Sequence, residues 1–243
     1  MKNNYTEQSN NLYPIDSVMK SVFIEEFVSI GMDIAEESID SLLDADVLSD
    51  IPIVKTIRAI AKVSLAIREK YLLKKMLIFI ETINHGKAKS EEIEKRKKAA
   101  ESNEKWLRKE IELITIHIDR LDELEKARLT AVFYIEYINL KITWLQYREY
   151  LAIIERVFFQ DFIQLLDIYD AILQDKKVKD LIKKGADGGV ITKKISELNC
   201  DRLIAVGLVQ AKRSPIYNGN MLTDYDLTRL GLKFAEVLNK LKK

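Results

Sequence analysis

The most regular pattern of apolar and polar positions in the chain runs through residues 47–83 (VLSDIPIVKTIRAIAKVSLAIREKYLLKKMLIFIETI). Apolar side chains recur there at helical spacing and cover more than one face, while Lys55, Arg58 and Lys62 belong to a polar stripe. A helix with so much apolar surface is normally buried on most sides. We therefore predict a central core helix that stops near Gly86, with its basic side chains reaching the solvent.

An alternative for the same helix is a position on a membrane surface, because one of its faces is basic. Lys55, Arg58 and Lys62 would then face the membrane or a partner protein. A membrane-spanning helix is not predicted, because the longest charge-free runs are five residues, 63–67 and 76–80. A span needs roughly 18 apolar residues in a row.

Further amphipathic helices are predicted on both sides of this stretch. The first begins at Asp16 or Ser17 and runs to about Leu43. The 98 residues from Lys87 to Lys184 contain neither Gly nor Pro, which favours long helices. We place these helices near residues 91–126, 128–138, 144–159 and 162–174.

Local signals support these helices. The segments 143–146 and 161–164 each fit a capping box, in which the side chains of Thr143 or Asp161 and of a Gln satisfy free backbone amides. A seam of apolar positions precedes them: Leu107, Ile111, Ile114, Ile118 and Leu121. Because the seam lasts about two heptads, we expect it to pack inside the chain, with dimerisation as the alternative.

Aromatic side chains gather in the second half of this region, and we predict that they form an aromatic core. A platform for stacking nucleic-acid bases would need interleaved Lys and Arg, in which this region is poor. The clustered residues are Phe133, Tyr134, Tyr137, Trp144, Tyr147, Tyr150, Phe158, Phe159 and Phe162.

After residue 175 the pattern changes, since four of the 8 Gly residues fall between residues 185 and 207. Gly207 is expected to end a helix in the left-handed conformation, Pro215 to lie in a turn, and Thr228 to cap the last helix. Helix, two-stranded ribbon and helix is the order of the back half of a winged-helix module. The predicted elements are helices at residues 178–184 and 192–206, strands at 208–213 and 221–227, and a helix at 229–241.

Together these patterns predict a mainly α fold, in which a multi-helix bundle is followed by a small winged-helix-like α+β module. The predicted domains are a flexible N-terminus at residues 1–15, a helical bundle domain at 16–175 and the winged-helix-like module at 176–243. The composition agrees, because 47% hydrophobic and 32% charged residues with 8 Gly and 3 Pro in 243 residues is typical of long amphipathic helices.

The formal net charge is +1, so the chain as a whole does not indicate a nucleic-acid partner. Residues 1–50 carry 2 basic and 11 acidic side chains, whereas residues 176–243 carry 15 basic and 7 acidic ones. Nucleic-acid binding by the C-terminal module is therefore an alternative function, although Glu197 and Asp201 lie in its candidate recognition helix. The side chains expected to contact phosphates are Lys193, Lys194, Arg202, Lys212 and Arg213.

Residues that would support catalysis or metal binding are sparse. The two histidines, His85 and His117, are not in zinc-ligand pairs, and no phosphate-binding loop or nucleophile motif occurs. Asp119 and Asp122 are expected to form helix ion pairs with residues such as Lys126 rather than to hold a divalent metal. We expect a protein that is not an enzyme, with no catalytic residues, no metal, no cofactor and no small-molecule substrate.

The single cysteine, Cys200, excludes an intrachain disulfide and fits a reducing compartment. We expect it to be a buried core thiol. The polar N-terminal sequence MKNNYTEQSNNLY lacks the apolar segment of a secretory signal. A cytoplasmic protein is therefore predicted, with a peripheral position at the membrane as the alternative.

Two parts of the sequence resemble known groups of proteins. Residues 48–54 (LSDIPIV), 67–79 (IREKYLLKKMLIF) and 118–127 (IDRLDELEKA) resemble a widespread set of uncharacterised bacterial proteins. The tail resembles the abortive-infection alpha family in residues 201–209 (DRLIAVGLV) and 225–231 (YDLTRLG). Neither resemblance brings catalytic residues with it. Together they imply a bacterial or mobile-element protein concerned with phage resistance.

Three hypotheses of function follow. The first is a non-catalytic protein that acts through contact with a protein partner or with its own copies, in phage defence or in a prophage. The second is a nucleic-acid-binding protein that uses the C-terminal module. The third is a membrane-perturbing effector that uses the helix at residues 51–83.

Overall fold

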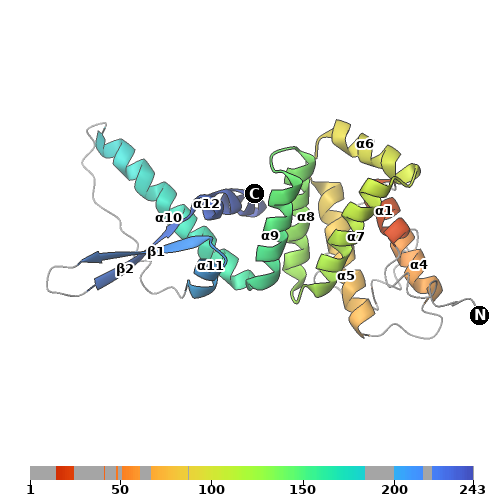
Figure 1. Cartoon of the computed structure of the whole chain (residues 1–243), viewed down its shortest axis with the longest axis horizontal. Helices are drawn as coiled ribbons and strands as arrows, with labels where there is room; N and C mark the ends of the chain where they lie inside the picture. The colour runs from red at the N-terminus through yellow and green to blue at the C-terminus, as the bar shows by residue number, and fades with distance from the viewer. Residues whose placement is uncertain are drawn as a thin grey trace, which may run out of the picture. The chain divides into compact units, whose positions relative to one another are not determined.

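The computed structural model describes most of the chain, and Figure 1 shows it as mainly helical with one small sheet. The described residues are 15–24, 41, 48, 51–60, 67–86, 88–183, 200–215 and 221–242. Within these ranges, only the backbone is described for residues 58–60, 175–183, 212–215, 221–224 and 242.

The chain forms two compact units, Met1–Leu151 and Ala152–Lys243. The division falls inside α9 (Trp144–Arg156). The boundary predicted after residue 175 lies inside α10 (Phe159–Lys183). The prediction that one helix ends at 174 and another begins at 178 is wrong, because α10 continues without a break. The domain limits themselves remain predictions.

The first unit begins with α1 (Ile15–Phe23), α4 (Pro52–Ile60) and α5 (Ile67–His85). The first predicted helix is thus found up to Phe23, while residues 25–40 lie outside the described part. Ser21 of α1 binds the start of α4, since its Oγ accepts a hydrogen bond from the backbone N–H of Ile53 at 3.1 Å. This contact satisfies one of the free amides at a helix N-terminus.

Helix α5 is the centre of the first unit and packs against α1, α7 (Lys105–Arg120) and α8 (Leu124–Ile138). Every residue from Leu73 to Ile80 is buried, which confirms the prediction of a core helix. Two details of that prediction are wrong. Lys74 and Lys75 are buried instead of reaching the solvent, and Ile67, one of the apolar side chains at helical spacing that were expected to be buried, is 88% exposed. Residues 61–66 lie outside the described part, so the continuity of one helix from 51 to 83 remains a prediction.

The single helix predicted at 91–126 is replaced by α6 (Ser90–Glu101), α7 (Lys105–Arg120) and the start of α8 (Leu124–Ile138). Helix α6 ends because Asn103 adopts a left-handed conformation with φ of 52°. Helix α7 ends because Leu121 is extended. The predicted seam is confirmed as internal, since all five of its side chains are buried: Leu107, Ile111, Ile114, Ile118 and Leu121.

One of the two predicted capping boxes is confirmed. Thr143 N–H donates to Gln146 Oε1 at 2.9 Å, and Gln146 N–H donates to Thr143 Oγ1 at 3.2 Å, directly before α9. The box at Asp161 is wrong, because α10 begins two residues earlier. Asp161 is the third residue of that helix, and its Oδ2 accepts a hydrogen bond from Phe158 N–H at 3.1 Å.

The aromatic core is confirmed for most of its predicted members. In the first unit Phe133 of α8 packs on Tyr150 of α9 with ring centroids 4.9 Å apart. In the second unit Phe162 stacks on Phe234 at 5.4 Å. Phe158 is an exception, because 51% of its surface is exposed.

The second unit ends in a helix–hairpin–helix segment. The two strands pair antiparallel, from Val209 opposite Leu227 to Pro215 opposite Met221, so Pro215 closes a strand instead of lying in a turn. Gly207 has a φ of +75° and ends the preceding helix, as predicted. Thr228 caps α12, since its Oγ1 accepts a hydrogen bond from Gly231 N–H at 2.9 Å. The elements are α11 (Asp201–Ala205), β1 (Val209–Pro215), β2 (Met221–Leu227), α12 (Arg229–Leu238) and the 3-10 helix η1 (Asn239–Lys242).

Candidate functional site

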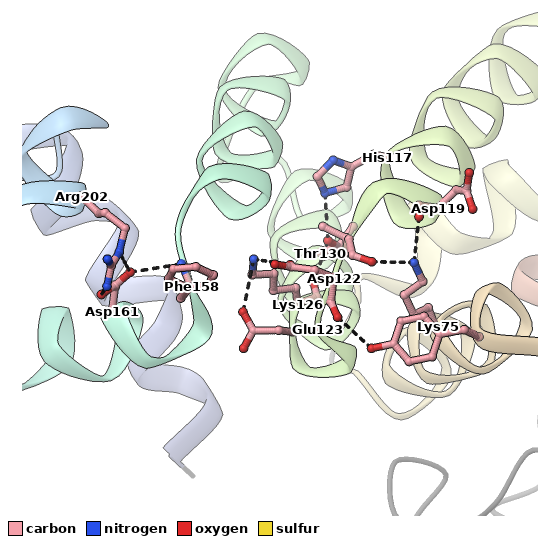
Figure 2. A network of polar contacts seen from close by, with 12 residues as sticks. Lys75, His117, Asp119, Asp122, Glu123, Lys126, Thr130, Phe158, Asp161 and Arg202 are labelled. Carbon is pink, nitrogen blue, oxygen red and sulfur yellow. Dashed lines mark hydrogen bonds and ion pairs between the residues drawn. The ribbon is translucent and has the colours of Figure 1, made fainter. Parts of the chain in front are cut away.

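The richest group of polar contacts surrounds the loop between α7 and α8, and Figure 2 shows it from close by. Lys75 of α5 donates hydrogen bonds from Nζ to the carbonyl oxygens of Asp119 at 2.9 Å and Leu121 at 2.7 Å. The last carbonyls of a helix have no partner within it, so Lys75 caps the C-terminus of α7. Arg68 pairs with the Asp119 carboxylate, and Tyr71 Oη donates to the Asp122 carbonyl at 2.9 Å. We call this group the loop cluster.

Burial lowers the pKa of Lys75 to about 8, although the nearby Asp119 carboxylate favours the charged form. An amine with such a pKa is partly neutral just above physiological pH and could act as a nucleophile. In this structure the ammonium is buried and binds two carbonyls. Lys75 therefore serves as a cap for the C-terminus of α7.

Lys126 joins the other side of the loop cluster. Its buried Nζ lies 2.6 Å from Asp122 Oδ1 and 3.3 Å from Glu123 Oε1. Burial alone would raise the pKa of Asp122, but the hydrogen bond and charge of Lys126 hold it below its usual value. The predicted ion pair with Lys126 is thus confirmed for Asp122, whereas the Asp119 carboxylate pairs with Arg68 of α5. Within the described ranges no group of three or more His, Cys, Asp or Glu side chains could hold a metal ion.

His117 lies beside the loop cluster and is buried. Its Nε2 is 3.4 Å from Thr130 Oγ1. Burial, together with the positive charges of Arg120 and Lys75, lowers the pKa of His117 to about 4. The imidazole is therefore neutral at physiological pH. The other histidine, His85, is exposed at the end of α5, as its predicted place at a helix stop requires.

A second buried group was missed by the sequence analysis. Glu110 of α7 accepts a hydrogen bond from Tyr134 Oη, accepts another from Tyr137 Oη at 3.1 Å, and lies 3.5 Å from Nε of Arg96. Arg96 in turn pairs with Glu92 at 3.1 Å. Glu110 falls between seam positions at helical spacing, three residues after Leu107, and that is the signal that could have found it.

The tyrosines of this second group stay protonated. Burial and the Glu110 carboxylate raise the pKa of Tyr137 to about 12 and also raise the pKa of Tyr134. The guanidinium of Arg96 lies over the Tyr137 ring at 5.3 Å and over the Trp106 ring at 5.7 Å. The group fastens α6, α7 and α8 to one another, because its members come from all three helices.

In the second unit, Arg202 of α11 forms a two-pronged ion pair with Asp161 of α10. Nε lies 2.6 Å from Oδ2, and Nη2 lies 2.7 Å from Oδ1 (Figure 2). The guanidinium also lies 4.8 Å from the centroid of the Phe158 ring. Arg202 was predicted to contact phosphates, yet its charge is already matched by a buried carboxylate.

The other predicted phosphate-binding residues are only partly described. Lys193 and Lys194 lie outside the described residues. Lys212 and Arg213 lie next to each other in β1, where the strand register places Lys212 opposite Asp224 and Arg213 opposite Thr223. The structure therefore places an acidic residue directly across from Lys212.

The predicted membrane or partner face is described in part. Lys55 is exposed on α4, Arg58 lies on the same helix with its side chain undescribed, and Lys62 lies outside the described residues. Cys200 is buried, as predicted, and burial raises the pKa of its thiol. Among the helices that the structure describes, none has the length and apolar character needed to cross a membrane.

The polar clusters share one chemical character. The buried charges of Lys75, Glu110, Lys126 and Asp161 each meet an opposite charge, backbone carbonyls or tyrosine hydroxyls, as burial requires. Their visible role is to hold helices and loops in place. Comparisons of this chain with family models, with curated proteins and with solved structures find no match.

Proposed function

We propose that the chain is a non-catalytic helical protein that acts through protein–protein contact, in a phage-defence or prophage setting. The setting is supported by the two resemblances, that of residues 48–54, 67–79 and 118–127 to uncharacterised bacterial proteins and that of residues 201–209 and 225–231 to the abortive-infection alpha family. The contact is supported by the surface of the second unit. The polar clusters support the non-catalytic part, because their side chains are occupied in holding the fold.

The observation that carries the proposal is a set of large apolar side chains exposed on the second unit. Each has more than a third of its surface open, although single exposed apolar residues are common on proteins. A contiguous group of such side chains is typical of a surface that meets a partner, and we propose that those of the second unit form one. They come from α10, α11, α12 and their flanks: Phe158 (51%), Ile163 (41%), Ile204 (37%), Leu232 (39%) and Leu241 (39%).

The test is phage plating efficiency in a bacterial host, with and without the protein. We expect the wild type to lower plating by orders of magnitude and the triple variant Ile163→Gln, Ile204→Gln, Leu232→Gln to lose this effect. Gln is a good helix former, so the variant should keep its fold, which circular dichroism checks. The control is Ile67→Gln, which removes the most exposed large apolar side chain among the described residues of the first unit.

Two results would contradict the proposal in different ways. Unchanged plating across a broad phage panel with the wild type would remove the defence setting. Full activity of the triple variant would remove this surface as the contact. Light scattering of the purified protein tells whether the partner is a second copy, because the triple variant would then lower the measured mass.

The alternative of nucleic-acid binding follows from a winged-helix-like arrangement, which we also propose for α11, β1, β2 and α12. Exposed Arg229 and Lys233 on α12 favour it. Arg202 and the register of Lys212 opposite Asp224 weaken it, because both basic residues have an acidic neighbour. Binding to DNA that falls steeply with added salt, and that falls further in Arg229→Gln with Lys233→Gln, would support this alternative.

The alternative function, in which the helix at residues 51–83 perturbs a membrane, requires α5 to leave the core. Nine of its residues are buried, and Lys75 holds the end of α7. Release of α5 would therefore expose both an apolar face and a free helix terminus. Leakage of liposomes on addition of the protein tests this alternative directly.

A further inference from the structure

The end of α8 carries an unexpected residue. Leu140 N–H donates to the carbonyl of Tyr137 at 2.9 Å, and Lys141 N–H donates to the carbonyl of Glu136 at 3.0 Å. These two bonds form a Schellman motif, whose left-handed position is usually Gly and sometimes Asn. Here the position holds Leu140 with a φ of 59°. A left-handed conformation is unfavourable for a residue with a branched apolar side chain.

Burial does not compensate for this strain, because 66% of the Leu140 surface is exposed. Leu145, at the start of α9, is 75% exposed. Leu140 follows the C-cap Asn139 of α8, and Leu145 is the second residue of α9, directly after the partly exposed Trp144. We call Leu140, Trp144 and Leu145 the leucine edge. Backbone strain of this kind is often found at functional sites, where it serves a role other than the stability of the fold.

The loop that carries the leucine edge is held firmly. Lys141 Nζ pairs with Glu136 Oε1 at 3.3 Å, and the capping box of Thr143 fixes the start of α9. Asn139 Oδ1 accepts a hydrogen bond from the backbone N–H of Lys89 at 2.7 Å, which ties the loop to the start of α6. The leucines are therefore presented by a preorganised frame, and binding would cost little ordering.

We infer that the leucine edge inserts into the interfacial layer of a lipid bilayer that contains anionic lipids. Trp is typical of the level of the lipid headgroups, and leucines beside it enter the acyl boundary. Lys141 follows Leu140 directly, and Arg148 lies one helical turn after Leu145; both are exposed. Their charges suit an anionic surface. This inference goes beyond the proposed function and uses a different unit of the chain.

A protein partner fits the leucine edge less well. Two leucines and part of a Trp are a small fraction of the about 800 Å² that each partner of a stable protein interface buries. A second copy of this chain fits poorly as well. Two leucine edges placed face to face would still bury only the small area of two leucines and part of a Trp from each copy, well below what a stable interface buries.

The charge preference should be modest. Glu149 is exposed next to Arg148, and Glu136 already neutralises part of the Lys141 charge. Insertion of the two leucines therefore supplies most of the attraction. We expect binding to vesicles of phosphatidylcholine alone that is several-fold weaker, and only a small loss of binding to anionic vesicles when salt is added.

The experiment uses the full chain and vesicles made from equal parts of phosphatidylcholine and phosphatidylglycerol. The chain has 2 Trp residues, so Trp106→Phe leaves Trp144 as the only fluorescent indole. We expect its emission to shift to the blue and to be quenched by brominated lipid. Sedimentation with the vesicles measures the partitioning.

The decisive variant is Leu140→Gly, because it relieves backbone strain and should fold at least as well as the wild type. We expect its partitioning to fall by about tenfold, and that of Leu145→Gln to fall similarly. The matched control is Asn103→Gly, which makes the same kind of change at the end of α6 and should bind normally.

Three outcomes would overturn the inference. The first is a wild type that binds neither vesicle, and the second is a Leu140→Gly variant that binds as well as the wild type. The third is a wild type that does not bind vesicles, together with a Leu140→Gly variant that loses phage protection. That combination would assign the leucine edge to a protein partner. These results are separable from the proposed function, since that proposal is tested by phage plating with the wild type and with variants of the second unit, not by vesicle binding.

Discussion

The ends of α8 and α11 have the same backbone geometry and different residues at the same position. At α11, Gly207 N–H donates to the Ile204 carbonyl and Leu208 N–H to the Leu203 carbonyl, both at 2.9 Å. At α8, the equivalent bonds surround Leu140. The φ angles are +75° for Gly207 and 59° for Leu140. The hydrogen bonds at a helix end can therefore form even when the left-handed position holds a residue that disfavours this conformation. Such a residue suggests a role other than ending the helix.

The end of α6 lies between these two cases. Asn103, with φ of 52°, makes the same pair of bonds through its own N–H and that of Glu104. Asn is the commonest substitute for Gly in the left-handed region, because its short polar side chain bonds locally. Two of these three helix ends thus follow the usual preference for the left-handed position. Only Leu140 among them departs from it, and it is also strongly exposed.

The largest expected effect separates a glycine that is needed for space from one that is needed for its conformation. A Cβ on Gly231 would lie 1.8 Å from the carbonyl oxygen of Leu208, which is backbone and cannot move aside cheaply. We expect Gly231→Ala to destabilise the second unit by about 3 kcal/mol or more. Urea unfolding measures it. Gly207→Ala is the control, since nothing lies within 4 Å of its Cβ, and an equal loss there would contradict the steric argument.

Lowering the pH should destabilise the first unit, which carries Leu140, because His117 becomes protonated. The folded pKa of His117 is about 4 and its usual value is 6.5. Between these values the unfolded chain binds the proton and the folded chain does not. Stability is therefore lost as the pH falls from 6.5 to 4, by at most about 3 kcal/mol from this group. Protonation would add a charge near Lys75, Lys126 and Arg120.

The measurement is hydrogen exchange of the first unit between pH 7 and pH 4, corrected for the intrinsic rate. His117→Gln should flatten the pH dependence of α7 and α8, whatever it does to stability at neutral pH. A variant that keeps the full wild-type pH dependence would show that carboxyl groups, not His117, cause the loss.

Replacing Gly207 at the end of α11 with leucine, the residue at the equivalent position of α8, should have a smaller effect on stability. Gly207→Leu introduces the left-handed strain of a leucine, and its Cβ finds no packing partner. We expect a loss of about 1 kcal/mol, measured by urea unfolding. Gly207→Asn is the matched control and should lose less. Equal losses for Leu and Asn would mean that the left-handed position does not distinguish these side chains.

The reverse change, Leu140→Gly, should have the smallest effect on stability. Relief of strain is partly offset by the greater freedom of glycine in the unfolded chain and by the loss of the buried third of the leucine side chain. We expect a gain of about 0.5 kcal/mol, seen as a slightly higher urea midpoint. A clear loss of stability would show that Leu140 serves the fold, and would remove the strain argument for the leucine edge.

The sequence alone determined the elements whose signals are local. The capping box at Thr143, the cap at Thr228, the left-handed Gly207 and the strands around residues 209–227 were all predicted and found. Each depends on hydrogen bonds between residues a few positions apart or on the conformational freedom of one residue. Such signals can be read from a short window of sequence.

Only the tertiary structure decided which charged residues are buried. Lys75 meets carbonyls 44 and 46 residues away, Glu110 meets Tyr134 24 residues later, and Arg202 meets Asp161 41 residues earlier. Helical spacing places such residues on a face but does not state what covers that face. A buried charge is stable only when a distant partner is brought to it, and folding of the whole unit supplies that partner.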